Sequence, residues 1–288
     1  MNGERQSTRE KTQRGPLYRS LTAIRESTVV VCTACLPRGD GHLDLPSGNR
    51  RIYHFHIRKT GGTSVNRAFM GLGPRPSERV VQSLQKSPIN RAKSGPYTFT
   101  RHSMKSIELG SYDYAHSHFP YDLVSIPEDT FTFTILRDPV RRVISHYRML
   151  RDLSKDPNNI AWRTKGDMPA AVEYGWLGDS FDDFLERAPI SALKKQIHTF
   201  SIDLNPVRAE ERIMACDAVL WTEELGDCLD KLGSTLGISL ELKRDRQSIE
   251  PFEPNPSQLA NLKHLLADEI DMLARLRSSW NPASLSFH

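Results

Sequence analysis

The residues best suited to chemistry lie in the short segment Lys59-Thr60-Gly61-Gly62-Thr63-Ser64. An alternating apolar run at 51–57 predicts a strand before it, and apolar spacing over 65–72 predicts an amphipathic helix after it. Glycines let the backbone approach a ligand closely, and the N–H groups of a first helical turn have no helical acceptors. Lys59 adds a positive charge, and the threonine and serine hydroxyls add hydrogen-bond donors. The segment therefore predicts a pocket for a phosphate or sulfate group.

The order of these residues differs from the Walker A motif. In that motif the lysine stands at the end of the loop, whereas here Lys59 precedes both glycines. A structural alternative is a Gly-Gly turn followed by a serine or threonine helix cap, which needs no ligand. A second segment favours the anion pocket over this alternative.

This second segment begins with a run of β-branched and aromatic residues at 131–136, which predicts a buried strand. Asp138 is a good helix N-cap and Pro139 suits the first helical position, so a helix is expected at 139–153. Ser145 lies on this helix among several arginines. A solvated basic face would explain the helical arginines. It would not explain Arg137 at the end of the strand, where α/β folds place ligand contacts.

Two histidines, His116 and His118, form the third candidate group. Their i, i+2 spacing on an extended segment places both side chains on one face. Histidine suits a general base because its ordinary pKa lies near neutrality. A pair of structural histidines is the alternative, and no metal site is expected because the sequence offers no third or fourth ligand. His54 and His56 are expected to pack or to support their neighbours.

Residues 54–64 resemble the 5′-phosphosulfate loop of the sulfotransferases that use 3′-phosphoadenosine 5′-phosphosulfate (PAPS). Residues 137–147 resemble the 3′-phosphate motif of the same family, in the expected order. A looser resemblance covers about residues 51–277, and the branch it resembles contains heparan sulfate 2-O-sulfotransferase and bacterial carbohydrate sulfotransferases. Arg58 departs from the pattern, because the family usually has proline there.

The resemblance implies transfer of a sulfuryl group from PAPS to an acceptor hydroxyl, most suitably on a carbohydrate. Arg137 and Ser145 would hold the 3′-phosphate, and Lys59 would stabilise the departing phosphate. His118 matches a family histidine near the transferred group and would accept the proton. His116 matches the additional histidine of the 2-O-sulfotransferase branch and would orient or replace it. The residues expected to bind the 5′ end of PAPS are Lys59, Thr60, Gly61, Gly62, Thr63 and Ser64, and no metal is required.

Two other classes of function stay open. A P-loop-type nucleotide kinase or NTPase would need a Walker A motif and a magnesium carboxylate, and the sequence shows neither. A non-catalytic nucleotide- or glycan-binding module of the same fold would bind PAPS without transfer. The acceptor site is the least determined part, and its candidate lining residues are Trp162, Arg163, Lys165, Trp176 and the segment 191–200.

Length and composition agree with a globular enzyme. The chain has 288 residues, a net charge of only +4 and a pI near 8.9, which does not indicate a nucleic-acid binder. No apolar stretch reaches the roughly 18 residues of a membrane span. Since Golgi members of the family carry an anchor, a cytoplasmic protein is expected. The cysteines do not indicate a disulfide scaffold or a zinc site.

The pattern of elements predicts the fold. Strands are also expected at 112–116 and 217–221, and helices at 181–188, 223–236 and 257–277. Residues 73–98 are expected to form a long loop or short helices. Alternating strands and helices predict a parallel sheet flanked by helices, similar to the P-loop-NTPase-like sulfotransferase fold. A polar, partly disordered extension is expected at 1–49 and a sulfotransferase domain at 50–288.

Overall fold

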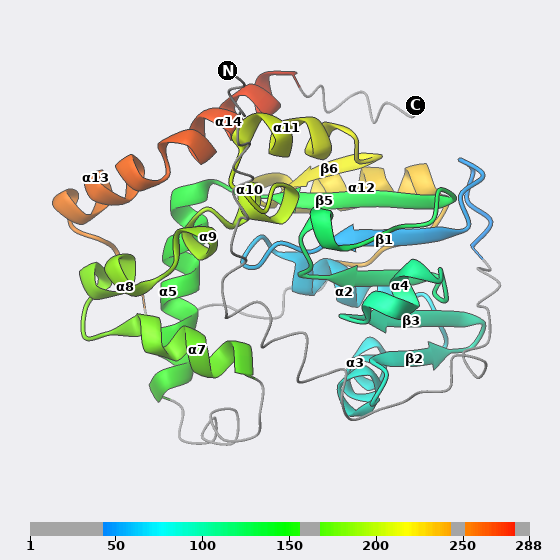
Figure 1. Cartoon of the computed structure of the whole chain (residues 1–288). Helices are drawn as coiled ribbons and strands as arrows, with labels where there is room; N and C mark the ends of the chain where they lie inside the picture. Colours follow the sequence, from blue (N-terminus) through cyan, green and yellow to red (C-terminus); the bar gives the residue numbers. More distant parts are fainter. Residues whose placement is uncertain (1–42, 156–167, 243–250, 280–288) are drawn as a thin grey trace, which may run out of the picture. The chain divides into compact units, whose positions relative to one another are not determined.

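A six-stranded, mostly parallel sheet is the centre of the computed structural model, which describes residues 43–155, 168–242 and 251–279 (Figure 1). The strand order is β2-β3-β4-β1-β5-β6, and only the β2–β3 pair is antiparallel. All described residues belong to one unit of the chain, residues 38–288. The strands are β1 Arg51–Phe55, β2 Arg91–Ser94, β3 Tyr97–Arg101, β4 Tyr114–Ser117, β5 Thr130–Leu136 and β6 Ala218–Trp221.

The central strands are buried on both faces, as parallel strands covered by helices are. In the register of the sheet, His54 of β1 lies beside His116 of β4 and Phe133 of β5. Because β4, β1, β5 and β6 run in the same direction, their carboxyl ends meet at one edge. The segments that follow β1, β4 and β5 therefore come together there.

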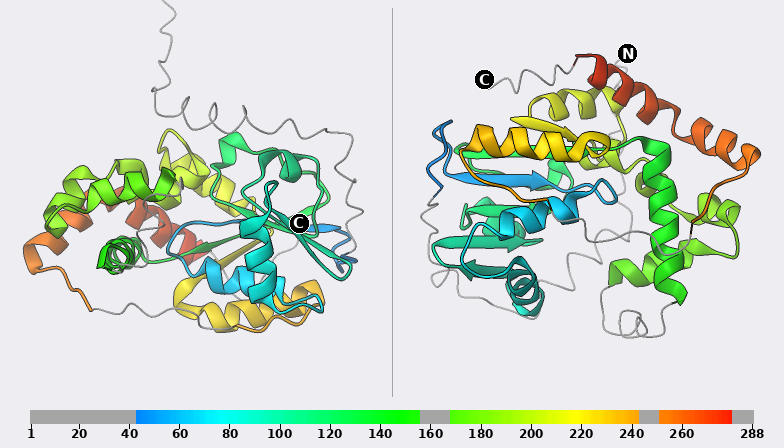
Figure 2. Two further views of the ribbon diagram at one scale, coloured as in Figure 1. Left: turned by 90° about the horizontal axis from the view of Figure 1, so that it is seen from below. Right: turned by 180° about the vertical axis from the view of Figure 1, so that it is seen from behind.

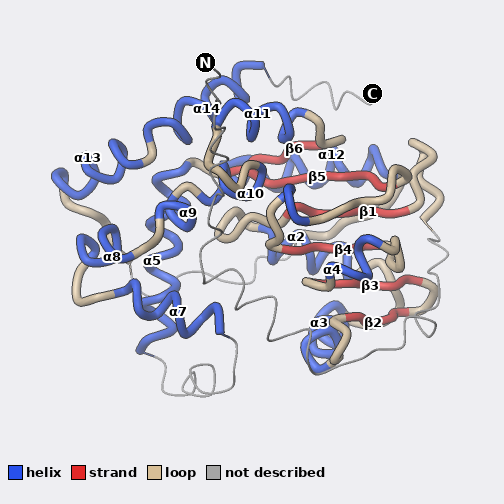
Figure 3. Tube along the Cα trace, viewed as in Figure 1, coloured by secondary structure: helices blue, strands red, loops and turns tan. Residues whose placement is uncertain are grey.

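Helices cover both faces of the sheet, and Figure 3 shows the strands between them. Buried residues of α2, α3 and α12 pack on one face, and those of α4, α10, α11 and α14 pack on the other (Figure 2). The helices of the first face are α2 Gly62–Met70, α3 Ser77–Lys86 and α12 Leu225–Leu236. Those of the second face are α4 Met104–Glu108, α10 Lys195–Phe200, α11 Pro206–Met214 and α14 Ala267–Ser279. The expected helix-flanked parallel sheet is thus confirmed.

A third group of buried side chains joins the helices that follow β5. Figure 1 shows these helices beyond the carboxyl ends of the strands. They are α5 Pro139–Lys155, α7 Met168–Leu177, α8 Phe181–Arg187, α9 Ile190–Leu193 and α13 Pro256–Leu265. In the parts of the chain that the structure describes, no helix is long and apolar enough to cross a bilayer.

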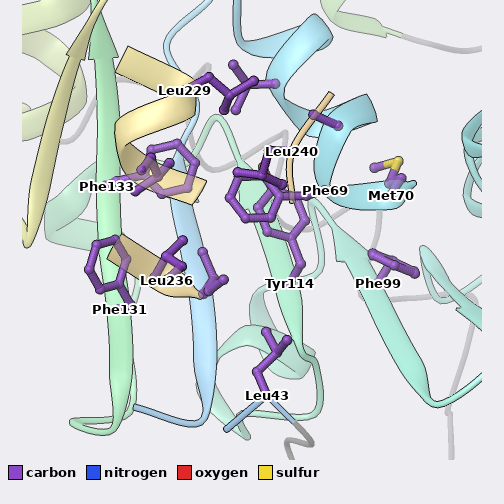
Figure 4. Close-up of a cluster of buried hydrophobic side chains, with 14 of the residues drawn as sticks. Leu43, Phe69, Met70, Phe99, Tyr114, Phe131, Phe133, Leu229, Leu236 and Leu240 are labelled. Carbon is purple, nitrogen blue, oxygen red and sulfur yellow. The ribbon is translucent and has the colours of Figure 1, made fainter. Parts of the chain in front are cut away.

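The core beneath α2 is aromatic (Figure 4). Phe69 stacks on Tyr114 with a centroid separation of 4.3 Å, and Phe133 lies beside Phe69 at 5.6 Å. This cluster fixes α2 against β4 and β5, and so fixes where α2 begins. Leu43 and Leu45 are buried in the same cluster, so the described fold includes residues that precede position 50.

Two local expectations were wrong in part: a short helix is present within residues 73–98, but a hairpin follows it, and the long C-terminal helix is divided. Residues 73–98 hold α3 and most of the β2–β3 hairpin, because Gly95 adopts a positive φ of 60° and makes the turn between two short, partly polar strands. The predicted helix 257–277 is two helices that meet at Leu266. Its first half packs with the helices beyond the strands through Leu262, and its second half packs on the sheet through Leu273. The change of packing partner explains the break.

Candidate active site

The loop between β1 and α2 is held by the ends of two neighbouring strands. The Arg137 guanidinium, at the end of β5, donates a hydrogen bond to the Lys59 carbonyl at 2.9 Å. The Thr222 hydroxyl, just after β6, donates to the Thr60 carbonyl at 2.7 Å. Thr60 itself donates from Oγ1 to the carbonyl of Ile57 at 2.9 Å. The backbone of the predicted anion loop is thus fixed at several points before any ligand arrives.

Both glycines of the loop are required by its geometry. Gly61 has a φ of 86°, and a Cβ there would lie 2.9 Å from Leu225 Cδ2. A Cβ on Gly62 would lie 2.3 Å from Cδ2 and 2.5 Å from Nε2 of His56. Lys59 also has a positive φ, 70°, which is uncommon for a residue other than glycine. The chain accepts this backbone strain where the loop turns into α2.

Helix α2 begins in a way that suits an anion. Its N-cap is Gly61, no described side chain caps it, and its first turn contains no acidic residue. The alternative of a serine or threonine cap is therefore wrong. The Ser64 N–H donates to the Gly61 carbonyl at 3.1 Å, so the helix dipole and the N–H groups of Gly62 and Thr63 are left for a negatively charged group. A cavity of about 390 Å³ opens beside this turn and is lined in part by Ser64, Thr222 and Glu223.

Arg137 is positioned through its own backbone. Its N–H donates to Gln196 Oε1 at 2.9 Å, and its carbonyl accepts from Gln196 Nε2 at 3.0 Å. The side-chain amide of Gln196 therefore pairs with the backbone N–H and carbonyl of Arg137, as the backbone of a neighbouring strand would. Ser145 lies two turns along α5, partly exposed.

Three fully buried side chains stand behind this contact, and we call them the Arg142 cluster: Arg142, Gln196 and Glu269. The Glu269 carboxylate accepts from Gln196 Nε2 at 3.0 Å and from the Gln196 backbone N–H at 3.1 Å. Arg142 Nε lies 3.9 Å from the same carboxylate, and the guanidinium also donates to the carbonyls of Ala192 and Leu193. Burial raises the pKa of Glu269, and Arg142 and these hydrogen bonds oppose the rise.

A second group consists of imidazoles, and we call it the histidine cluster: the buried His54, His56 and His116, and the partly exposed His102 and His118. The ring of His118 lies 4.5 Å from that of His56 and 4.7 Å from that of His102, centroid to centroid. His116 lies 5.6 Å from each of these two rings. The structure thus brings His116 and His118 together with the residues that precede the anion loop.

The tautomer of His118 follows from its partner. His118 Nδ1 lies 2.6 Å from the carbonyl of His56, so Nδ1 carries the proton and Nε2 keeps its lone pair. The backbone N–H of His118 donates to His102 Nδ1 at 3.3 Å. Burial, then the charges of His56, His102 and Arg58, hold the pKa of His118 well below its usual value. The ring is therefore neutral at neutral pH, with Nε2 able to accept a proton.

His116 and His54 are enclosed more fully. Burial holds the pKa of His116 well below its usual value, and its Nδ1 has no hydrogen-bond partner among the described residues. His54 stacks on Phe133 at 4.5 Å and bonds Asn66 Oδ1 through Nδ1 at 2.8 Å, as expected of a packing residue. No group of His, Cys, Asp or Glu within the described ranges is arranged to hold a metal ion.

Comparison with known protein families identifies the family of the chain. A model of the family described as "Sulfotransferase family" matches residues 46–270, which include the loop, both histidines and Arg137. The chain belongs to this family. A solved structure described as a sulfotransferase from Alicyclobacillus acidocaldarius is 14% identical, with a TM-score of 0.40, and the match covers 81% of this chain and 97% of that one. A search of curated proteins found no significant match.

Several site residues of this sulfotransferase carry no local sequence signal. His102 has a φ of 47° and lies outside the motifs, just after β3. Gln196 falls in the segment 191–200, which the sequence indicates as a candidate lining of the acceptor site and not as a support for Arg137. Glu269 is 132 positions from Arg137 in the chain and reaches it only through Gln196. The sequence gives no pattern that would join these positions.

Of the residues expected to line the acceptor site, only some lie within the described ranges. Trp162, Arg163 and Lys165 lie outside the described residues. Trp176 of α7 packs against the His146 ring at 6.2 Å and is partly buried. Arg58, the residue that departs from the family pattern, forms an ion pair with Glu173 of α7, and His146 Nε2 lies 3.4 Å from the same carboxylate.

Proposed function

We propose that this sulfotransferase transfers the sulfuryl group of PAPS to a hydroxyl of a carbohydrate acceptor. The observation that carries the proposal is the hydrogen bond from Arg137 to the Lys59 carbonyl, which joins the two expected anion-binding motifs. The uncapped start of α2 and the membership of the family give it further support.

The residues present fit a bisphosphorylated donor. The backbone N–H groups of residues 60–63 and the hydroxyls of Thr63 and Ser64 would bind the 5′-phosphate, at a helix start free of acidic side chains. The Thr60 hydroxyl is committed to the Ile57 carbonyl. Arg137 and Ser145 would hold the 3′-phosphate, with Arg137 fixed by Gln196. The cavity beside Ser64 and Thr222 gives room for the nucleoside part.

The chemistry needs a base and a stabilised leaving group. The acceptor oxygen forms a bond to sulfur while the bond between sulfur and the 5′-phosphate oxygen breaks. Nε2 of His118 takes the acceptor proton, since Nδ1 is committed to the His56 carbonyl. Lys59 offsets the charge that develops on the departing phosphate. His116 would help to orient His118 through the rings of His56 and His102, which both of them contact. The products are a sulfate ester and 3′-phosphoadenosine 5′-phosphate (PAP).

The carbohydrate acceptor and the likeness to the heparan sulfate 2-O-sulfotransferase branch rest on the histidine pair and the 3′-phosphate motif. The domain division, with an extension at 1–49 and the sulfotransferase domain at 50–288, rests on composition and motif positions.

Calorimetric titration with PAP and with 5′-AMP, which lacks only the 3′-phosphate, tests the donor assignment. Charge-assisted hydrogen bonds contribute about 1.5–3 kcal/mol each, so PAP should bind roughly 10- to 150-fold more tightly. Arg137→Ala should weaken PAP binding more than 5′-AMP binding and so remove most of that difference, while the loss of its bond to the Lys59 carbonyl should weaken 5′-AMP binding to a smaller extent. Equal affinities for PAP and 5′-AMP in the native protein would contradict the assignment. Preference for ATP would favour a kinase, and PAPS binding without transfer to any acceptor would favour a binding module.

A further inference from the structure

The imidazole of His56 lies against the first residue of α2. His56 is only 8% exposed, and a Cβ on Gly62 would lie 2.5 Å from its Nε2. Because the Cβ of a helical residue points back toward the helix N-terminus, the ring edge that carries Nε2 occupies the space at the start of α2. Nδ1 of the ring bonds Asn66, whereas Nε2 forms no hydrogen bond with any described residue. A buried polar atom is therefore directed at the place where the anion is expected.

The buried amide of Asn66 decides which nitrogen of His56 carries the proton. Asn66 Oδ1 accepts from the Tyr114 hydroxyl at 2.7 Å and lies 2.8 Å from Nδ1 of His54, which donates to it. These two donors fix the orientation of the amide, and they place Nδ2 of Asn66 3.3 Å from Nδ1 of His56. With the amide reversed, the Tyr114 hydroxyl would lose this acceptor. Since an amide nitrogen only donates, Nδ1 of His56 accepts and the proton lies on Nε2.

The charge state of His56 agrees with this tautomer. Burial, and then the charges of His54, His102 and Arg58, hold the pKa of His56 well below its usual value. A protonated ring would carry hydrogens on both nitrogens, and its Nδ1 would meet the amide nitrogen of Asn66 as a second donor. The neutral ring satisfies Asn66 and keeps a single N–H, at Nε2.

We propose that His56 donates a hydrogen bond from Nε2 to an oxygen of the 5′-phosphate of the sulfuryl donor. This inference rests on the proposed function, which places that phosphate at the start of α2. The Gly62 and Thr63 N–H groups reach the phosphate from the helix, and the imidazole adds a donor from the end of β1. The glycine at position 62 is then required for binding as well as for packing, because it leaves room for the ring. The His56 ring also lies 4.5 Å from that of His118, so it connects the phosphate site with the proposed base.

The test uses two nucleotides that each carry one phosphate, 5′-AMP and 3′-AMP. His56→Leu removes the imidazole and should weaken 5′-AMP binding roughly 10- to 150-fold in calorimetric titration. The affinity for 3′-AMP, which has no phosphate for the loop, should stay near native. His56→Gln offers an amide N–H near the position of Nε2 and should recover part of the lost affinity. Both variants lack Nδ1, so the difference between them reports on the donor at Nε2.

His54→Leu is the matched control. It removes a neighbouring imidazole whose proton lies on Nδ1 and is directed at Asn66, so the ratio of the two affinities should not change. An unchanged affinity of His56→Leu for 5′-AMP would overturn the proposal. An equal loss for 5′-AMP and 3′-AMP would also overturn it, because such a loss would show a general disturbance of the site.

Nitrogen-15 NMR of the imidazole rings gives a readout on the native protein. The His56 signals, assigned by their absence in His56→Gln, should show a proton on Nε2, and the Nε2 signal should shift on addition of 5′-AMP but not of 3′-AMP. A ring protonated only at Nδ1 would contradict the proposal. If PAPS binds but supports no transfer, the proposed function fails, and the nucleotide comparison still decides whether His56 binds the 5′-phosphate.

Discussion

The Arg142 cluster and the histidine cluster both lie at the carboxyl edge of the sheet, yet they keep polar groups inside the protein by different means. In the Arg142 cluster, a guanidinium and a carboxylate are buried together, and Gln196 joins them to Arg137. In the histidine cluster, burial lowers the pKa values of His54, His56, His116 and His118, so these four imidazoles are neutral. The first cluster compensates a buried cationic side chain with a carboxylate, whereas burial in the second favours neutral imidazoles.

This difference matches two different requirements. A residue that grips a phosphate must keep its position when the phosphate leaves, and a charge-compensated network with several hydrogen bonds provides that rigidity. A general base must be unprotonated and must have a free lone pair. The histidine cluster provides both, and it leaves Nε2 of His54 and Nδ1 of His116 without hydrogen-bond partners among the described residues. One cluster is suited to hold the donor and the other to move a proton.

The largest expected effect comes from removing the base. His118→Ala should lower kcat by about 10²- to 10⁴-fold, because that is the usual contribution of general-base catalysis. PAP affinity, measured by calorimetry, should stay near native. His116→Ala should lower kcat by a smaller factor, since His116 would only orient His118. Near-native turnover of His118→Ala would place the base elsewhere, with His116 as the first residue to test, and would end the functional contrast between the clusters.

The next effect concerns stability. Glu269→Leu leaves the Arg142 charge buried without its carboxylate, which should lower the free energy of unfolding by about 3–5 kcal/mol. Denaturant titration measures the change. The double variant Arg142→Met, Glu269→Leu should recover most of the loss, because no buried charge is left. If Glu269→Leu is as stable as the native protein, the Arg142 cluster does not depend on charge compensation.

The smallest effect is a shift in pH dependence. Because the pKa of His118 is held below 6.5, kcat should stay high as pH falls through 6.5 and decline only at lower pH, where Nε2 becomes protonated. Arg58→Pro restores the usual family residue and removes a nearby positive charge. The pKa of His118 should then rise, and the acid limb should move to higher pH. Arg58→Lys keeps the charge and should leave the limb in place, whereas a limb unchanged in Arg58→Pro would exclude Arg58 as a cause.

The parts predicted well from the sequence are those set by neighbouring residues. The strand, loop and helix around Lys59 were expected from local spacing, and so were β5 and α5 around Arg137. The hairpin β2–β3 was missed because short polar strands and a glycine turn resemble a loop.

The supporting residues of the site depend on contacts between distant segments. Gln196 lies 59 positions from Arg137, and Glu269 lies 73 positions from Gln196. An isolated glutamine or glutamate has no pattern that predicts burial. The pairing of Arg58 with Glu173, across 115 positions, is equally invisible to local spacing. Folding brings these groups together only after the sheet and its helices have formed.

The close approach of Gly62 to His56 restricts the substitutions that positions 56 and 62 can accept during evolution. Any side chain at position 62 would occupy the space of the His56 ring, so the two positions cannot vary independently. A smaller residue at 56 would have to come first. His56 orients His118 through its backbone carbonyl, which any residue at that position retains. A smaller residue at position 56 would therefore remove the two closest contacts and keep the orientation of the proposed base, but a Cβ at position 62 would still lie 2.9 Å from His54 Cε1, so the His54 ring would also have to move.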